Sequence, residues 1–165
     1  MGELRLRPLR AADERAFRAA HALMAGEGFV FGLGLDACPA WADYLASLDL
    51  LRAGVEVPEG LVPATFLVAE VAGEIVGRTS VRHELNDYLL REGGHIGYGV
   101  LPAYRRRGHA TEILRQSLVV ARAAGVDRVL VTCDEDNVAS GRAIEACGGR
   151  QEILPGTRRR RYWIG

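Results

Sequence analysis

The chain has 165 residues, of which 48% are hydrophobic and 25% are charged. This length and composition predict a single globular domain over residues 1–165. The 21 basic residues balance 21 acidic ones, and every basic residue is an arginine. Because lysine is absent, a Walker-type phosphate loop, a lysine Schiff base and the usual pyridoxal chemistry are excluded. The zero formal charge argues against a dedicated nucleic-acid binder.

Cysteine usage and hydropathy indicate the compartment. Cys38, Cys133 and Cys147 are odd in number and show no CxxC spacing, which favours reduced thiols and no metal site. The first residues lack the apolar segment of a signal peptide, and no run approaches the roughly 18 apolar residues of a membrane helix. We therefore expect a cytoplasmic protein with no membrane partner.

The N-terminal part predicts one strand and two helices. Residues 3–7 alternate as a strand that ends at a proline, and residues 11–25 have the apolar spacing of a helix. A second helix is expected to start with Pro39 at its first position and to end before Gly54. Residues 26–38, between the two helices, carry four glycines among apolar side chains and are a candidate substrate rim.

The remainder of the chain predicts further strands and two helices, which makes the fold class α/β with a mixed sheet. In chain order they are a hairpin of strands 65–71 and 75–82, a strand 95–101, a helix 108–124, a buried strand 129–133, a helix capped by Asn137 that ends at Gly148, and two strands around Gln151 and Tyr162.

The chain ends in a run of four arginines, residues 158–161, followed by three apolar residues. Strand alternation would divide the arginines between two faces, as in a solvated edge strand. Tyr162, Trp163 and Ile164 are expected either in the core or at a contact between two copies of the chain, that is, a homodimer.

The segment GYGVLPAYRRRGHATEILRQ carries the chemical information. A strand ends at a proline, arginines follow, and Gly108 stands at the entrance of a long amphipathic helix. Such an entrance exposes unpaired backbone N–H groups at the positive end of the helix dipole, where a phosphate binds readily. A glycine before a helix is also an ordinary strand-to-helix turn, so only its combination with the preceding arginines is specific.

This segment resembles the signature of the GNAT superfamily of N-acetyltransferases, Arg/Gln-x-x-Gly-x-Gly/Ala, with Arg105, Gly108 and Ala110 in its places. The likeness covers essentially the whole chain, through the segments LRPLRAADERA, VAGEIVG and DEDNVASGRAIEACGG. The chain is also similar to a little-characterised bacterial branch of predicted acetyltransferases. The resemblance implies the GNAT acyl-CoA N-acyltransferase fold, in which the central strands at 94–101 and 129–133 splay apart to admit a pantetheine arm.

The resemblance also implies an acetyl-CoA site without a metal. Tyr98, Gly99 and Val100 match the strand that pairs with pantetheine, and Asn137 matches the residue beside the pantetheine arm where the neighbouring strand ends. Ser140, on the helix that Asn137 caps, is a further candidate contact to the cofactor. The residues that match the pyrophosphate loop are Arg105, Arg106, Arg107, Gly108, His109, Ala110 and Thr111. Each has an ordinary alternative: Asn137 is also a normal helix cap, and residues 105–107 are also a solvated basic turn.

The reaction implied is direct attack of an amine on the acetyl thioester, with an oxyanion held by a strand N–H. An alkyl ammonium with a pKa of about 10 must first lose a proton. The candidate bases near the expected cleft are His83, Glu84, Glu92 and His95. Strand alternation puts His95 on the opposite face from Tyr98, so a structural role is its alternative, and Glu92 is also an ordinary solvated loop carboxylate.

The general acid departs from the family pattern. Many members carry a tyrosine seven residues after the asparagine, and this chain has Ile144 there. Ser140, Tyr98 or an ordered water is expected to substitute. Two other functions stay open: a CoA-binding module that transfers nothing, and an arginine-mediated nucleic-acid binder. The function expected is N-acetyl transfer from acetyl-CoA to a primary amine of a small molecule, peptide or protein.

Overall fold

The computed structural model describes residues 2–165, and its elements follow the predicted order. They are β1 (Arg5–Arg7), α1 (Glu14–Ala25), α2 (Trp41–Ala53), β2 (Ala64–Val71), β3 (Glu74–Arg82), β4 (Ile96–Val100), α3 (His109–Ala123), β5 (Val129–Asp134), α4 (Val138–Ala146), β6 (Arg150–Glu152) and β7 (Arg159–Ile164). The mixed α/β fold class is confirmed.

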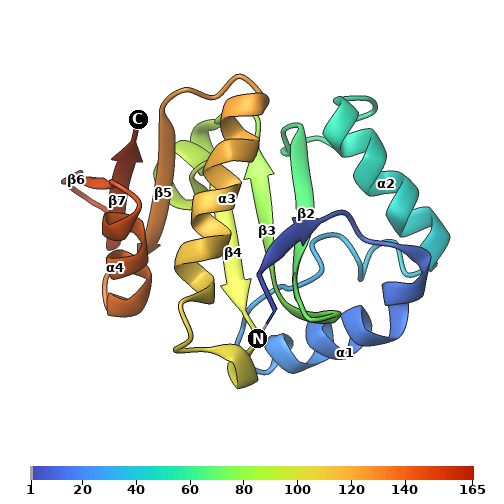
Figure 1. Ribbon diagram of the computed structural model, residues 1–165. Coiled ribbons are helices and arrows are strands. Elements are labelled where there is room, and N and C mark those ends of the chain that lie inside the picture. The colour runs from blue at the N-terminus through green and yellow to red at the C-terminus, as the bar shows by residue number, and fades with distance from the viewer. Residues whose placement is uncertain (1) are drawn as a thin grey trace.

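The strands form two sheets that meet at β4 and β5 (Figure 1). The first sheet has the order β1-β2-β3-β4 and the second β5-β7-β6, with antiparallel pairing in both. Helix α3 connects β4 to β5, which run in the same direction in Figure 1. The pair of strands predicted to splay therefore forms the boundary between the sheets.

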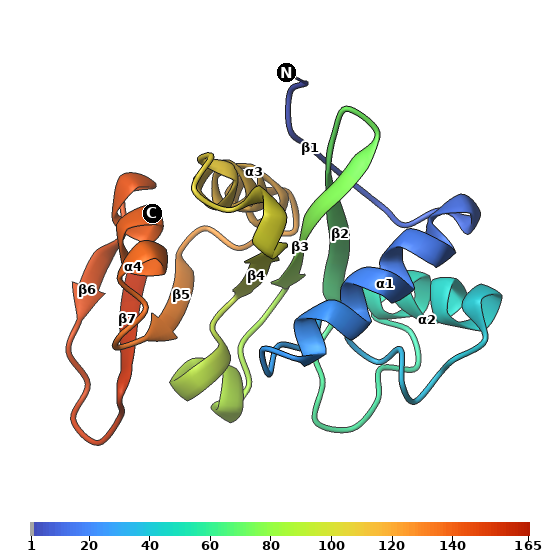
Figure 2. The ribbon, with the colours of Figure 1, turned by 90° about the horizontal axis from the view of Figure 1, so that it is seen from below.

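Apolar residues on both faces of the first sheet explain the helix positions. On one face, α1 and α2 enclose an aromatic cluster of Phe17, Phe31, Trp41, Tyr44 and Phe66. On the other face, α3 buries its apolar stripe, with α4 packed beside it. Figure 2 shows α3 on the opposite side of the strands from α1 and α2. Among residues 2–165, no helix combines the length and apolarity needed to cross a bilayer.

Two local predictions differ from the structure. Pro39 is not the first helical residue: α2 begins at Trp41 after the extended residue Ala40, whose carbonyl accepts the first helical hydrogen bond from the Tyr44 N–H at 2.9 Å. The Pro39 carbonyl instead accepts from Arg18 Nη2 of α1. Between β3 and β4, residues Leu89–Gly93 form one turn of π-helix, which the sequence did not indicate because that segment has no regular apolar period.

The prediction that the C-terminal arginines form a solvated edge strand is wrong. β7 lies between β5 and β6, so it is the central strand of its sheet. Arg161 is 3% exposed and donates to the main-chain carbonyl of Leu90, and Arg159 Nη1 lies 2.6 Å from Asp134 Oδ1. Arg159 is half-buried and Arg161 buried because neighbouring carboxylates and carbonyls satisfy their charges, whereas Arg158, before β7, is exposed. Tyr162 and Ile164 are core residues.

Candidate functional site

The edge of β4 that faces β5 is open. Leu101 N–H donates to Val76 and Arg82 N–H to the His95 carbonyl, so residues 95, 97, 99 and 101 use their main chain to pair with β3. The alternation of an antiparallel ladder then directs the main-chain groups of Tyr98 and Val100 toward β5. Within residues 2–165, no ladder joins β4 to β5 there. The splay therefore leaves the main-chain groups of Tyr98 and the N–H of Val100 open in the middle of the protein, while the Val100 carbonyl accepts from Arg105 Nε at 3.1 Å.

His95 closes the end of this opening. Its N–H donates to the Leu130 carbonyl at 2.7 Å, and its ring Nδ1 accepts from the Leu130 N–H at 2.9 Å. The residue is buried, and burial together with the Arg82 charge lowers the pKa of His95 to about 4. The ring is therefore neutral and replaces a strand hydrogen bond. The structure gives His95 a structural position and does not bring it to the cavity as a base.

His83, the other histidine expected as a base, is also elsewhere. Its Nε2 lies 2.8 Å from Thr65 Oγ1 of β2, and burial lowers its pKa. Neither His83 nor His95 lines the cavity described below. The sequence placed both histidines at the ends of strands, and strand alternation offered a structural role for His95, but the partners Leu130 and Thr65 could not be predicted.

The start of α3 presents unpaired main-chain donors. Gly108 is the N-cap with φ of 81° and no side chain caps the helix, so its first N–H groups have no intrahelical partner. Arg106 also has a positive φ of 63°. These two left-handed residues turn the loop so that it enters the helix directly after the arginines. The geometry is that of an anion site at a helix N-terminus.

One cavity of about 600 Å³ joins the open edge of β4 to the start of α3. It contains most of the residues matched to the family's cofactor site: Tyr98, Gly99, Val100, Arg105, Arg106, Gly108, His109, Ala110, Thr111, Asn137 and Ser140. Arg107 is not among the lining residues; its guanidinium lies over the Tyr104 ring at 5.8 Å. Eleven matched positions, far apart in the chain, therefore meet around one space.

The cavity also has a wall that the motif did not indicate, made by Met24, Glu27, Phe29, Tyr104, Ala139 and Ala143. Phe29 comes from the glycine-rich segment noted as a candidate rim. A Cβ at Gly99 would lie 2.6 Å from the Phe29 ring, so only glycine allows this packing. Arg105, expected on the cofactor, instead forms an ion pair with Glu27 at 2.7 Å and donates to the Val100 carbonyl.

Tyr98 and Ser140 meet across the splay. The hydroxyl of Tyr98, from β4, lies 2.8 Å from Ser140 Oγ of α4. Asn137 caps α4 by accepting from the Ser140 N–H at 3.1 Å, so its ordinary role as a cap is observed. Burial raises the pKa of Tyr98 to about 12, and this hydroxyl is therefore protonated at neutral pH.

Residues 3–150 match a family model described as an acetyltransferase (GNAT) domain. The chain belongs to the GNAT acetyltransferase family. An acetyltransferase of Photorhabdus laumondii, plu1384, is 33% identical over 99 residues, which cover 56% of this chain and 65% of that relative. The matched region thus spans slightly less than two thirds of the relative's length.

Solved structures show the same fold as this GNAT chain. An acetyltransferase from Agrobacterium tumefaciens superposes with a TM-score of 0.65 at 21% identity, covering 100% of this chain and 92% of that one. The yncA acetyltransferase from Salmonella typhimurium, whose structure holds its cofactor acetyl-CoA, has a TM-score of 0.60 at 17% identity, covering 97% and 91%. At these identities the likeness concerns the fold alone.

The GNAT chain departs from its family pattern at Ile144. This side chain is fully buried in the core with Leu114, Val131 and Tyr162. α4 instead turns Ser140 and Ala143 toward the cavity. A tyrosine at position 144 would therefore overpack the core of this protein rather than add a hydroxyl to the site.

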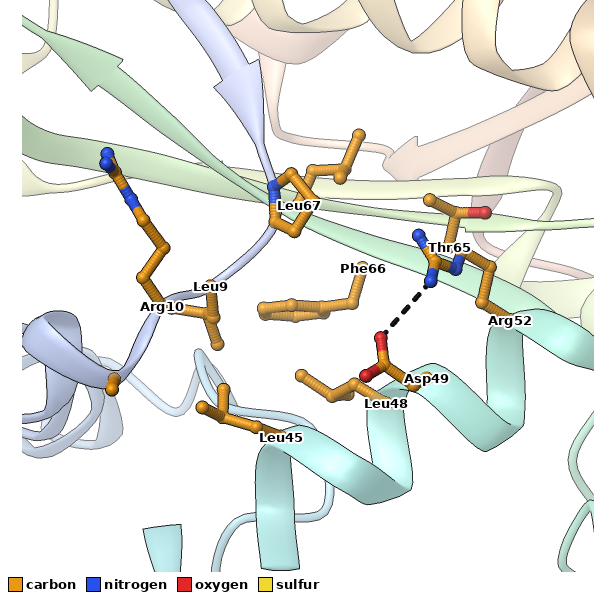
Figure 3. Close-up of a pocket in the computed structure, with 11 residues that line it drawn as sticks. Leu9, Arg10, Leu45, Leu48, Asp49, Arg52, Thr65, Phe66 and Leu67 are labelled. Atoms are coloured by element: carbon orange, nitrogen blue, oxygen red, sulfur yellow. Dashed lines mark hydrogen bonds and ion pairs between the residues drawn. The ribbon is translucent and has the colours of Figure 1, made fainter. Parts of the chain in front are cut away.

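A second cavity, of about 320 Å³, lies between α2 and β2. Figure 3 shows the side chains of Leu9, Leu45, Leu48 and Phe66 converging there, beside an ion pair of Asp49 and Arg52 at 3.2 Å. None of the residues that match the family's cofactor site line it. We therefore place the functional site at the first cavity.

Proposed function

We propose that this chain, acting as a single domain, is an acetyl-CoA-dependent N-acetyltransferase that acetylates a primary amine by direct attack. One observation carries the proposal: a single cavity connects an uncapped helix N-terminus to an open strand edge. The first feature suits a diphosphate and the second suits the amide groups of a pantetheine arm.

The residues present fit acetyl-CoA. The main-chain N–H groups at Gly108–Thr111 would hold the diphosphate, with Arg106 beside them, and no lysine is needed for this. The main-chain edge of Tyr98 and Val100 would pair with pantetheine and offer an N–H to the thioester carbonyl. Acetyl-CoA supplies the activated acetyl group when bound.

Direct attack is favoured over a covalent acetyl-cysteine. Burial raises the pKa of both Cys133 and Cys147, so neither thiol is ionised at neutral pH, and the thiolate is the nucleophilic form. Cys133 is also 4% exposed, within the core of the second sheet. A buried, protonated thiol is a packing residue here.

Tyr98 is proposed to stabilise the negative charge that develops on the departing sulfur. Its pKa of about 12 exceeds that of an ordinary thiol, about 8.5, so complete proton transfer from the hydroxyl to sulfur would be uphill. Donation of a hydrogen bond involves no such transfer. Ser140 accepts from or donates to the same hydroxyl and orients it.

The residues that line the cavity offer two candidate bases for the acceptor ammonium, Glu27 and His109. Glu27 is paired with Arg105. His109 stands at the start of α3, where the diphosphate is proposed to bind, and not beside the thioester. We propose that the ammonium releases its proton to bulk solvent through water that reaches the splay, and that the neutral amine then attacks the thioester.

Two measurements test this function. Calorimetry should show saturable binding of acetyl-CoA, and a thiol-release assay should show turnover with at least one member of a panel of primary amines. Binding with no transfer to any amine would identify a CoA-binding module. Salt-sensitive DNA or RNA binding without affinity for acetyl-CoA would reject the site assignment itself.

A further inference from the structure

Two arginines of β3 lie on the face of the sheet that α1 covers. Arg78 and Arg82 are four residues apart on one strand, so their side chains share a face. Thr79 points to the other face, where it bonds Ser117 of α3. Within residues 2–165, neither arginine has a carboxylate at ion-pair distance, and both side chains bond only main-chain carbonyls.

Arg78 is 4% exposed, and the protein satisfies all three of its nitrogen atoms. They donate to the carbonyls of Phe31 at 3.0 Å, Gly97 at 2.9 Å and Val30 at 2.6 Å. The guanidinium also stacks on the Phe29 ring at 4.5 Å. Arg78 thus holds the glycine-rich segment against β4. Its partners are neutral carbonyl groups, so no negative charge neutralises the guanidinium.

The Arg82 side chain has free hydrogen-bond donors. Only its Nη1 bonds the protein, to the carbonyls of Gly93 at 3.2 Å and Gly94 at 3.4 Å. Both terminal nitrogens lie 3.0 Å from where a Cβ of Gly97 would stand, so glycine at 97 makes room for the guanidinium. Arg82 and Gly97 are both half-buried. Arg82 Nε and Nη2 have no acceptor among residues 2–165 and are free to donate to a ligand.

A buried positive charge without a counter-ion is costly, and the cost falls when an anion binds. Burial lowers the pKa of Arg82 and lowers that of Arg78 to about 9, so Arg78 is charged at neutral pH. An acceptor that carries only an ammonium would be repelled. The adjacent nitrogens Nε and Nη2 form the planar fork that matches the two oxygens of a carboxylate.

We propose that Arg82, supported by Arg78, binds a carboxylate of the acceptor, so that the substrate is a carboxylate-bearing amine such as an amino acid. This inference rests on the proposed acetyltransferase function. Gly97 adjoins Tyr98, whose main-chain edge is the proposed place of the thioester carbonyl. The anion site is thus one residue along the strand from the reacting group, which suits an amine separated from its carboxylate by few bonds.

Acceptor pairs that differ only in the carboxylate test this on the wild-type protein. Thiol release and N-acetyl product would be measured with phenylalanine against phenethylamine and with leucine against 3-methylbutylamine. A charge-assisted hydrogen bond predicts kcat/KM about ten- to a hundredfold higher for the acids. Equal or faster turnover of the decarboxylated amines would overturn the inference and leave the acetyltransferase function standing.

Variants of Arg82 locate the effect. Arg82→Gln should raise KM for the preferred acid by about tenfold or more, with little change for its decarboxylated partner, and Arg82→Lys should restore part of the difference. Arg91→Gln, which removes an exposed arginine from the nearby π-helical turn, is the matched control and should leave both substrates unchanged. An equal loss for acid and amine in Arg82→Gln would overturn the assignment.

Measurement of acetyl-CoA binding distinguishes failure of the carboxylate site from failure of the proposed acetyltransferase function. Calorimetry should give the same affinity for wild type, Arg82→Gln and Arg91→Gln, because Arg82 does not line the cofactor cavity. If neither acids nor amines are acetylated while acetyl-CoA binds, the proposed function fails and this inference fails with it.

Discussion

At the residue scale, the site depends on side chains whose partners lie far away in the sequence. The sequence indicated Tyr98 and Ser140 as substitutes for a missing tyrosine, and the structure brings their hydroxyls to 2.8 Å. It did not indicate the ion pair between Arg105 and Glu27, because those residues are 78 positions apart and a local motif carries no information on such a contact.

Tyr98→Phe should lower kcat about five- to tenfold, the effect of one lost hydrogen bond to developing charge, with little change in KM for acetyl-CoA. Ser140→Ala should have a smaller effect, because the Tyr98 hydroxyl remains. Steady-state kinetics would measure both. Tyr162→Phe, which removes a buried tyrosine hydroxyl outside the cavity, is the control. An unchanged kcat in Tyr98→Phe would remove this residue from the mechanism.

His95 makes stability depend on pH. Its pKa is about 4 in the folded protein against 6.5 ordinarily, so the unfolded chain binds more protons between these values. The contribution of this pKa shift to the free energy of unfolding, at most about 3 kcal/mol, is therefore complete above pH 6.5 and is lost as pH falls toward 4. Urea unfolding between pH 7 and 5 would measure this loss. The His83 pKa is lowered too, so the comparison uses a His83→Gln background.

Two substitutions of His95 separate its hydrogen bond from its titration. His95→Asn offers an oxygen that can accept from the Leu130 N–H, and should remove the pH dependence at a small cost in stability. His95→Leu leaves that buried N–H unsatisfied and should cost about 1–3 kcal/mol more. A pH dependence that persists in both variants would show that other groups cause it.

At the element scale, the sequence predicted what local patterns determine. The α3 boundaries follow from its apolar stripe and from Gly108 and Gly125 at its two ends. The position of β7 between β5 and β6 was not predictable, because alternation along a strand does not state which strands flank it. For the same reason the arginines of β7 were expected at an edge, whereas they have partners in the interior.

Gly108→Ala should destabilise the protein by about 1–2 kcal/mol, since φ is 81° there although a methyl group would meet no atom within 4 Å. It should also weaken acetyl-CoA binding about tenfold, because relaxing φ moves the donors at the start of α3. Gly125→Ala is the matched control at the other end of α3, with φ of 90° and equally open space.

Calorimetry and urea unfolding would compare the two glycine variants. Similar losses of stability with a loss of affinity confined to Gly108→Ala would support the phosphate assignment. Equal affinity in both variants would contradict it.

At the scale of the whole molecule, the fold brings the site together by keeping two sheets apart. A single continuous sheet would pair β4 with β5 and consume the main-chain groups of Tyr98 and Val100. His95 joins the sheets at one end only, and the cavity occupies the opening beyond it. The resemblance implied splayed strands. It did not indicate that His95 ends the splay, because this depends on the contacts of the His95 main chain and ring with Leu130.

The central claim is transfer of an acetyl group from acetyl-CoA to an amine at this opening. The most direct measurement incubates the purified protein with acetyl-CoA and a panel of primary amines and amino acids, and quantifies free thiol and N-acetyl product by mass spectrometry. Direct transfer predicts equal amounts of thiol and of one or more N-acetyl products. Thiol release without an acetylated amine, or binding without thiol release, would contradict it.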